Sequence, residues 1–164
     1  MNHLTTMGWF HFSFAMFGIV IGAVQLLRRK GDRIHRALGY AYVYGMIVAD
    51  GTALAMYRFT GSFNVFHALA IVNLVCIFGA MLPLLQSPRP VNWLMRHYRW
   101  ITGSYIGPVA AGATQLIIRV LPTGSRTELW IVAAVVILSA TVVGTSLIRR
   151  NRPRQLQRVE PAIN

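Results

Sequence analysis

Four histidines at the margins of apolar stretches are the residues of this chain best suited to chemistry: His11, His35, His67 and His97. The first and third lie a few residues inside an apolar run, and the second and fourth lie at the start of one. Paired imidazoles from facing helices are the axial ligands of b-type haem. The spacing therefore favours a haem-binding electron-transfer protein, with His11 and His67 as one pair and His35 and His97 as the other.

Two arginines support this interpretation, because a haem carries two propionates that cationic side chains can bind. Arg36 directly follows His35, and Arg99 lies two residues after His97. We therefore add Arg36 and Arg99 to the predicted cofactor-binding residues. The predicted cofactor is haem b.

A metal ion is the alternative cofactor. His11, Asp50 and His67 would supply two imidazoles and one carboxylate, which is a ligand set that leaves a position open for water on zinc or iron. Such a site would make the protein an intramembrane metal-dependent hydrolase. The three residues come from three separate apolar runs, so no local motif supports the set, and whether the protein is an enzyme stays open.

The same polar residues also fit a structural role. Polar side chains inside a membrane protein form interhelical hydrogen bonds, and Asp50 could form a buried ion pair with Arg119. On this third interpretation the protein is a non-catalytic accessory subunit, with a membrane protein partner or a second copy of itself.

The elements that must position these residues are five apolar runs. The chain is 55% hydrophobic and only 12% charged, far below the roughly 25% charged residues of soluble domains. The runs cover residues 7–27, 37–57, 63–85, 100–121 and 129–148, and each is close to the roughly 20 residues that cross a bilayer as a helix. We predict an all-α polytopic transmembrane helix bundle of five spans, forming one domain over residues 1–148.

Most of the sixteen lysines and arginines fall in alternate gaps between the runs, at residues 28–36, 89–99 and 149–158. Short basic loops stay on the cytoplasmic side, which predicts an N-out/C-in multi-pass protein of the bacterial cytoplasmic (inner) membrane. Residues 149–164 are expected to form a disordered basic cytoplasmic tail that contacts anionic membrane lipids. The net charge of +12 would suit a nucleic-acid-binding protein, but its position at helix ends argues against nucleic acid as a partner.

Four segments resemble a known family. They are HRALGYAYV at 35–43, DGTAL at 50–54, FHALA at 66–70 and HYRWITGSYIG at 97–107, and they are similar to the predicted bacterial membrane proteins grouped as domain-of-unknown-function family 2306. The resemblance covers the first four predicted spans and leaves the fifth span and the tail outside. It implies membrane location and topology, and it implies no particular reaction.

Overall fold

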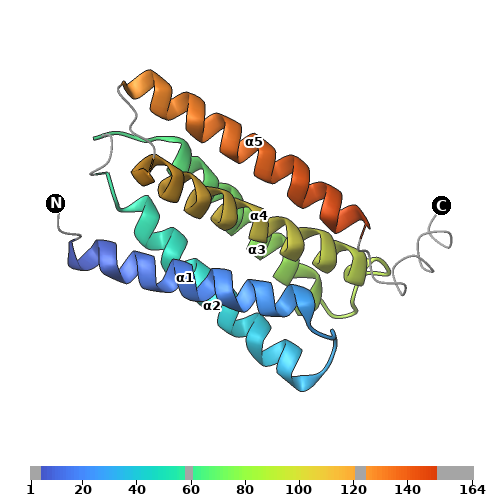
Figure 1. Ribbon diagram of the computed structural model, residues 1–164. Helices are drawn as coiled ribbons and strands as arrows, with labels where there is room; N and C mark the ends of the chain where they lie inside the picture. The colour runs from blue at the N-terminus through green and yellow to red at the C-terminus, as the bar shows by residue number, and fades with distance from the viewer. Residues whose placement is uncertain (1–4, 58–60, 121–124, 151–164) are drawn as a thin grey trace. The chain divides into compact units, whose positions relative to one another are not determined.

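The computed structural model describes residues 5–57, 61–120 and 125–150, and Figure 1 shows these residues as five α-helices without a strand. The helices are α1 (Thr6–Leu27), α2 (Arg33–Leu54), α3 (Val65–Leu85), α4 (Trp93–Val120) and α5 (Arg126–Arg150). The predicted all-helical fold with five helices is confirmed.

Four of the described helices, α1, α3, α4 and α5, are long and apolar enough to cross a membrane. The chain is therefore a polytopic helical membrane protein. Helix α2 has 22 residues, which gives it a length of about 33 Å at 1.5 Å per residue, but it carries Arg33, Arg36 and Asp50. Its buried residues include Tyr42, Met46 and Asp50. A helix that is covered by its neighbours can be this polar, and α2 as a fifth span stays a prediction.

Two helices start at least four residues earlier than the apolar runs. Helix α4 begins at Trp93 rather than at 100, and α2 covers Arg33–Leu54 rather than 37–57, because a helix can continue beyond the apolar core into polar surroundings. Helix α5 continues to Arg150, so the first two residues of the predicted tail are helical. The rest of that tail, 151–164, lies outside the described residues.

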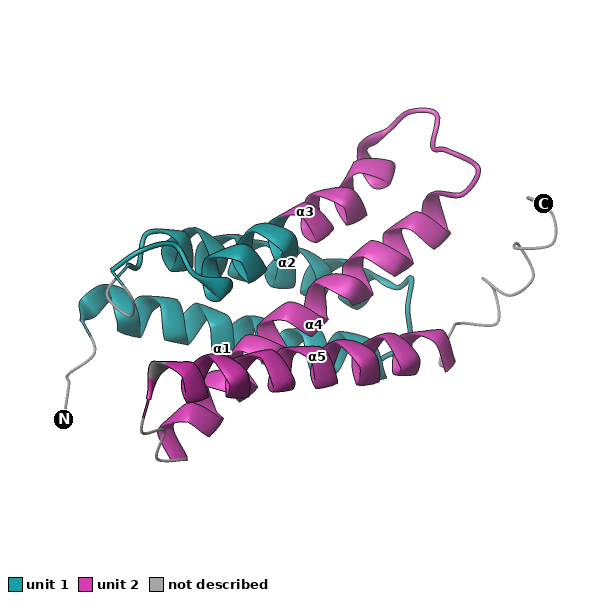
Figure 2. Cartoon of the chain, turned by 90° about the horizontal axis from the view of Figure 1, so that it is seen from above, with its two compact units in different colours: residues 1–74 teal, residues 75–164 magenta. Residues whose placement is uncertain are grey.

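Figure 2 shows the division of the chain into two compact units, Met1–Leu74 (unit 1) and Val75–Asn164 (unit 2). Unit 1 holds α1, α2 and the first half of α3, and unit 2 holds the second half of α3 with α4 and α5. Each unit contains one pair of antiparallel helices packed along each other, α1 with α2 and α4 with α5 (Figure 1).

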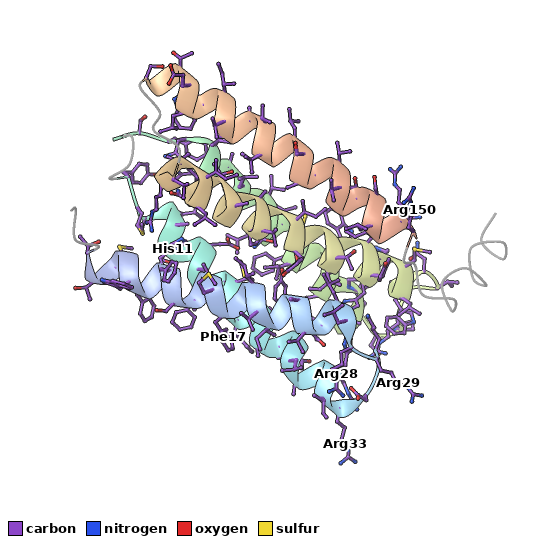
Figure 3. The ribbon with its side chains drawn as sticks, viewed as in Figure 1. His11, Phe17, Arg28, Arg29, Arg33 and Arg150 are labelled. Atoms are coloured by element: carbon purple, nitrogen blue, oxygen red, sulfur yellow. The ribbon has the colours of Figure 1, made fainter. Side chains whose placement is uncertain are left out.

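Glycines let the helices of each pair approach closely. A β-carbon at Gly18 of α1 would overlap the Met46 sulfur of α2, and one at Gly45 of α2 would lie 3.0 Å from the Phe17 ring of α1. Phe17 is labelled in Figure 3. In unit 2, a β-carbon at Gly144 of α5 would lie 2.9 Å from Ile106 of α4. Close contact of this kind stabilises helix pairs in membranes through van der Waals packing.

Helix α2 begins with a charged cap. Gly31 has a φ of +96°, which glycine adopts without steric cost and which turns the chain from α1 into α2. Asp32 then caps the helix, because its carboxylate accepts a hydrogen bond from the His35 backbone N–H at 2.6 Å. The same carboxylate forms an ion pair with Arg28 at 2.6 Å.

Because the Asp32 cap is charged, the stability of the folded protein should depend on pH. The His35 N–H and then Arg28 favour the charged carboxylate and hold the pKa of Asp32 below its ordinary value of 3.8. A pKa that is lowered by folding stabilises the protein above the unfolded pKa, and this contribution is lost as the pH falls through the folded pKa. We expect Asp32→Asn, which keeps an acceptor but no charge, to lower the melting temperature in detergent by a few degrees at pH 7 and by less near pH 3. An equal loss at both values would contradict this account.

Candidate functional site

His11 is held by the end of α2. Its Nδ1 lies 2.9 Å from the Ala49 carbonyl oxygen and 3.2 Å from the Thr52 hydroxyl oxygen, and the Thr52 hydroxyl itself donates to the Val48 and Ala49 carbonyls. A carbonyl oxygen can only accept, so Nδ1 carries the proton and the lone pair of the ring is on Nε2. Figure 3 shows His11 at the opposite end of the α1–α2 pair from Arg28, Arg29 and Arg33.

His67 lies in the first turn of α3 and is 2% exposed. Asn64 caps this helix, since its side-chain oxygen accepts from the Phe66 N–H at 2.9 Å. In return the Asn64 N–H donates to His67 Nδ1 at 3.3 Å. This reciprocal pair resembles a capping box in which histidine replaces the usual glutamate or glutamine.

Two aromatic rings also pack against the His67 ring. The Tyr57 ring lies 4.7 Å away and the Phe63 ring 5.2 Å away, each tilted by 31°. The remaining nitrogen, Nε2, is buried and has no hydrogen-bond partner among the described residues. Buried polar groups are nearly always paired, so an orphaned ring nitrogen indicates a position that a ligand can complete.

Asp50 has a partner that the sequence analysis did not identify. Its carboxylate, on a residue that is 7% exposed, accepts a hydrogen bond from the Asn73 side-chain amide at 2.7 Å. Asn73 is 2% exposed, and its own oxygen has no partner among the described residues. The Arg119 side chain, which was expected to pair with Asp50, is exposed in unit 2. The available signal was the polar side chain of Asn73 near the middle of the predicted apolar run 63–85.

His35, also in unit 1, is bound to α1 by Gln25. The Gln25 amide nitrogen donates to the His35 carbonyl at 2.8 Å, and the Gln25 side-chain oxygen lies 3.2 Å from His35 Nδ1. An amide oxygen only accepts, so the proton is on Nδ1, as in His11. Arg36, the next residue, has an exposed side chain.

His97 belongs to unit 2, where its Nδ1 donates to the Ala80 carbonyl of α3 at 3.0 Å. This bond ties the start of α4 to α3 and again puts the lone pair on Nε2. Arg99 has an exposed side chain and lines a groove between α4 and α5.

Three of the four histidines therefore share one arrangement. In His11, His35 and His97, Nδ1–H donates to an oxygen, which is the arrangement that second-shell partners impose on metal-binding histidines. His67 has the opposite arrangement, with Nδ1 accepting. The structure brings His11 and His67 into unit 1 and divides His35 and His97 between the units.

The predicted zinc or iron site is not assembled in the part of the chain that the structure describes. No three histidine, cysteine, aspartate or glutamate side chains there lie close enough together to hold a metal ion. Asp50 instead bonds to Asn73. The metal site of His11, Asp50 and His67 thus stays a prediction without structural support.

Comparison with known proteins agrees with the resemblance of the four segments and extends it. The family described as predicted membrane protein (DUF2306) matches residues 8–149, so the similarity continues through α5 and is longer than the sequence segments suggested. No curated protein and no solved structure matches the chain. The helices with membrane-spanning length and the family match lead to one conclusion: the chain belongs to the DUF2306 family of predicted membrane proteins.

Proposed function

We propose that unit 1 binds a b-type haem through His11 and His67, and that the protein is an electron carrier of the membrane. The observation that carries this proposal is His67 Nε2, a buried ring nitrogen without a partner among the described residues. Leaving a buried donor or acceptor unpaired costs about 1–3 kcal/mol. A ligand bound at this position would remove that cost.

His11 and His67 differ in how much each ring must change before its Nε2 can bind the haem iron. His11 needs no change, because its Nδ1–H bond to Ala49 orients the ring and leaves the Nε2 lone pair available. His67 must shift its proton from Nε2 to Nδ1 and give up the bond from Asn64, which at 3.3 Å is a long one. Giving up one such bond costs about 1 kcal/mol. A haem with two histidine ligands, when bound, supplies one-electron transfer.

The predicted inner pair is divided between the two units, with His35 in unit 1 and His97 in unit 2. Both rings have Nδ1–H bonded to an oxygen. A haem held by this pair stays a prediction from the sequence.

The proposed orientation is N-out/C-in, in the bacterial cytoplasmic membrane. The basic residues at the α1–α2 connection and at the end of α5 support it, since basic loops remain in the cytoplasm. A reporter enzyme that is active only in the periplasm should therefore be inactive when it is fused after Gly31. Activity there would reverse the orientation.

The test of haem binding is visible spectroscopy on detergent-purified protein from haem-supplemented cells. The proposal predicts a Soret band and a haem content of about one or two per chain. His11→Ala should remove the haem of the outer pair. A wild-type protein without a Soret band would end the proposal.

A second variant separates ligation from folding. His67→Gln keeps an acceptor for the Asn64 N–H, since glutamine is the common residue at this position of a capping box, but it removes the imidazole. We expect this variant to fold and to lose the same haem as His11→Ala. Trp9→Ala, on α1 and 57% exposed, is the matched control and should keep its haem. Full haem content in His67→Gln would exclude His67 as a ligand.

A further inference from the structure

A groove of unit 2 lies between α4 and α5, and no histidine lines it. It has a volume of about 530 Å³ and is lined by Tyr98, Arg99, Gly103, Ile106, Thr145, Ile148 and Arg149. Two guanidinium groups thus share a groove with an apolar floor. The haem proposed above, with His11 and His67 as ligands, uses no residue that lines this groove.

The groove lies where the end of α5 contacts α4 through a hydrogen bond and a packed side chain. The Tyr98 hydroxyl donates to the Ile148 carbonyl oxygen at 3.1 Å, and one helical turn further the Ile106 side chain packs against Gly144. Gly103 lies between these two contacts on α4, and a β-carbon there would meet no atom within 4 Å. The missing side chain at Gly103 therefore leaves open space in the floor.

The ligand chemistry follows from the order of these residues along the helices. Arg99 and Arg149 are exposed and lie at the start of α4 and the end of α5, where a membrane helix leaves the hydrocarbon core. Gly103 and Ile106 continue the groove along α4 toward the apolar middle of that helix. A molecule that fits must be anionic at one end and apolar at the other.

We propose that this groove binds an anionic phospholipid, with the phosphate between Arg99 and Arg149 and an acyl chain along Gly103 and Ile106. Basic pockets between transmembrane helices bind anionic headgroups in this way. The lipid also covers apolar surface that α4 and α5 leave open between them.

The test measures retained lipid by native mass spectrometry after the detergent-purified protein is incubated with phosphatidylglycerol or with phosphatidylcholine. Both lipids have a phosphate, and only phosphatidylglycerol has a net negative charge. We expect preferential retention of phosphatidylglycerol. Arg149→Gln should weaken its binding about fivefold, the effect of one basic residue near a headgroup. Equal retention of both lipids would overturn the proposal.

Two further variants locate the lipid. Arg150→Gln removes a neighbouring exposed charge that does not line the groove, and it should change binding less than twofold. Gly103→Leu fills the floor and should weaken phosphatidylglycerol binding without a change of charge. An equal effect of Arg149→Gln and Arg150→Gln would show that the lipid is attracted by the basic surface in general. Displacement of the lipid by millimolar inorganic phosphate would show that the site binds free phosphate. Either result contradicts a lipid bound in the groove.

The lipid test is separate from the haem test. Arg149, Arg150 and Gly103 are not among the proposed haem ligands or propionate partners, so their variants should keep the Soret band of the wild type. Failure of either proposal leaves the other standing.

Discussion

Asn73→Ala is expected to destabilise the protein by about 1–3 kcal/mol, the cost when a buried polar group loses its hydrogen-bond partner. The Asn73 side-chain amide donates a hydrogen bond to the Asp50 carboxylate at 2.7 Å, and both residues are buried in unit 1. Neutral hydrogen bonds between membrane helices are worth only about 0.6 kcal/mol on average. The larger effect is expected because the substitution leaves a buried carboxylate without this donor.

A double-mutant cycle measures the contribution of the charge. Asp50→Asn keeps an oxygen that accepts from Asn73 and removes the carboxylate, so Asn73→Ala made in that background should cost only about 0.6 kcal/mol. Reversible unfolding in mixed micelles gives the four free energies of unfolding. Equal costs of Asn73→Ala in the two backgrounds would show that the Asp50 charge does not contribute.

Gly79→Ala is expected to destabilise unit 2 by about 1–3 kcal/mol, the usual cost of forcing an extra carbon into a close helix–helix contact. A β-carbon at Gly79 of α3 would lie 2.9 to 3.2 Å from three atoms of the Trp100 ring of α4. The indole is rigid, so it must move as a whole. Trp100 follows His97 by one helical turn, and a shift of the ring would strain the His97 bond to Ala80.

Gly103→Ala is the matched control, because a β-carbon at Gly103 of α4 meets no atom within 4 Å. Alanine is favoured over glycine in a helix by up to about 1 kcal/mol, so this variant should be as stable as the wild type or slightly more stable. Melting temperatures of the two variants in the same detergent give the comparison. Two equal shifts would mean that the contact with Trp100 is not what restricts residue 79.

Two residues of the candidate site were predictable from the sequence, because an ionisable side chain within an apolar run is costly to bury and therefore indicates a functional site. His67 and Asp50 were selected as ionisable residues within apolar runs, and the structure buries both. Their hydrogen-bond partners were not predicted. Asn64 and Asn73 both lie within the predicted apolar run 63–85, and the presence of an amide in a run does not say which ionisable residue it bonds to.

The residue that each glycine contacts was likewise not predictable from the sequence. In the sequence, Gly18, Gly79 and Gly103 are equivalent, because each is a glycine within an apolar run. In the structure the first faces Met46 and the second faces Trp100, while the third faces open space in the α4–α5 groove. What lies opposite a glycine depends on the rotation and offset of the neighbouring helix, and hydropathy contains no information on either.

The sequence by itself determined that this protein is an all-helical membrane protein, because helices with apolar surfaces satisfy their backbone hydrogen bonds without water. Apolar length is a local property, so α1, α3, α4 and α5 could be located along the chain without any knowledge of their contacts. Only the tertiary structure decided which nitrogen of each histidine carries the proton, since this depends on a carbonyl, amide or N–H group brought close by folding. It likewise decided that Asp50 pairs with Asn73 and that Arg99 and Arg149 share one groove, because these pairs join residues far apart in the chain.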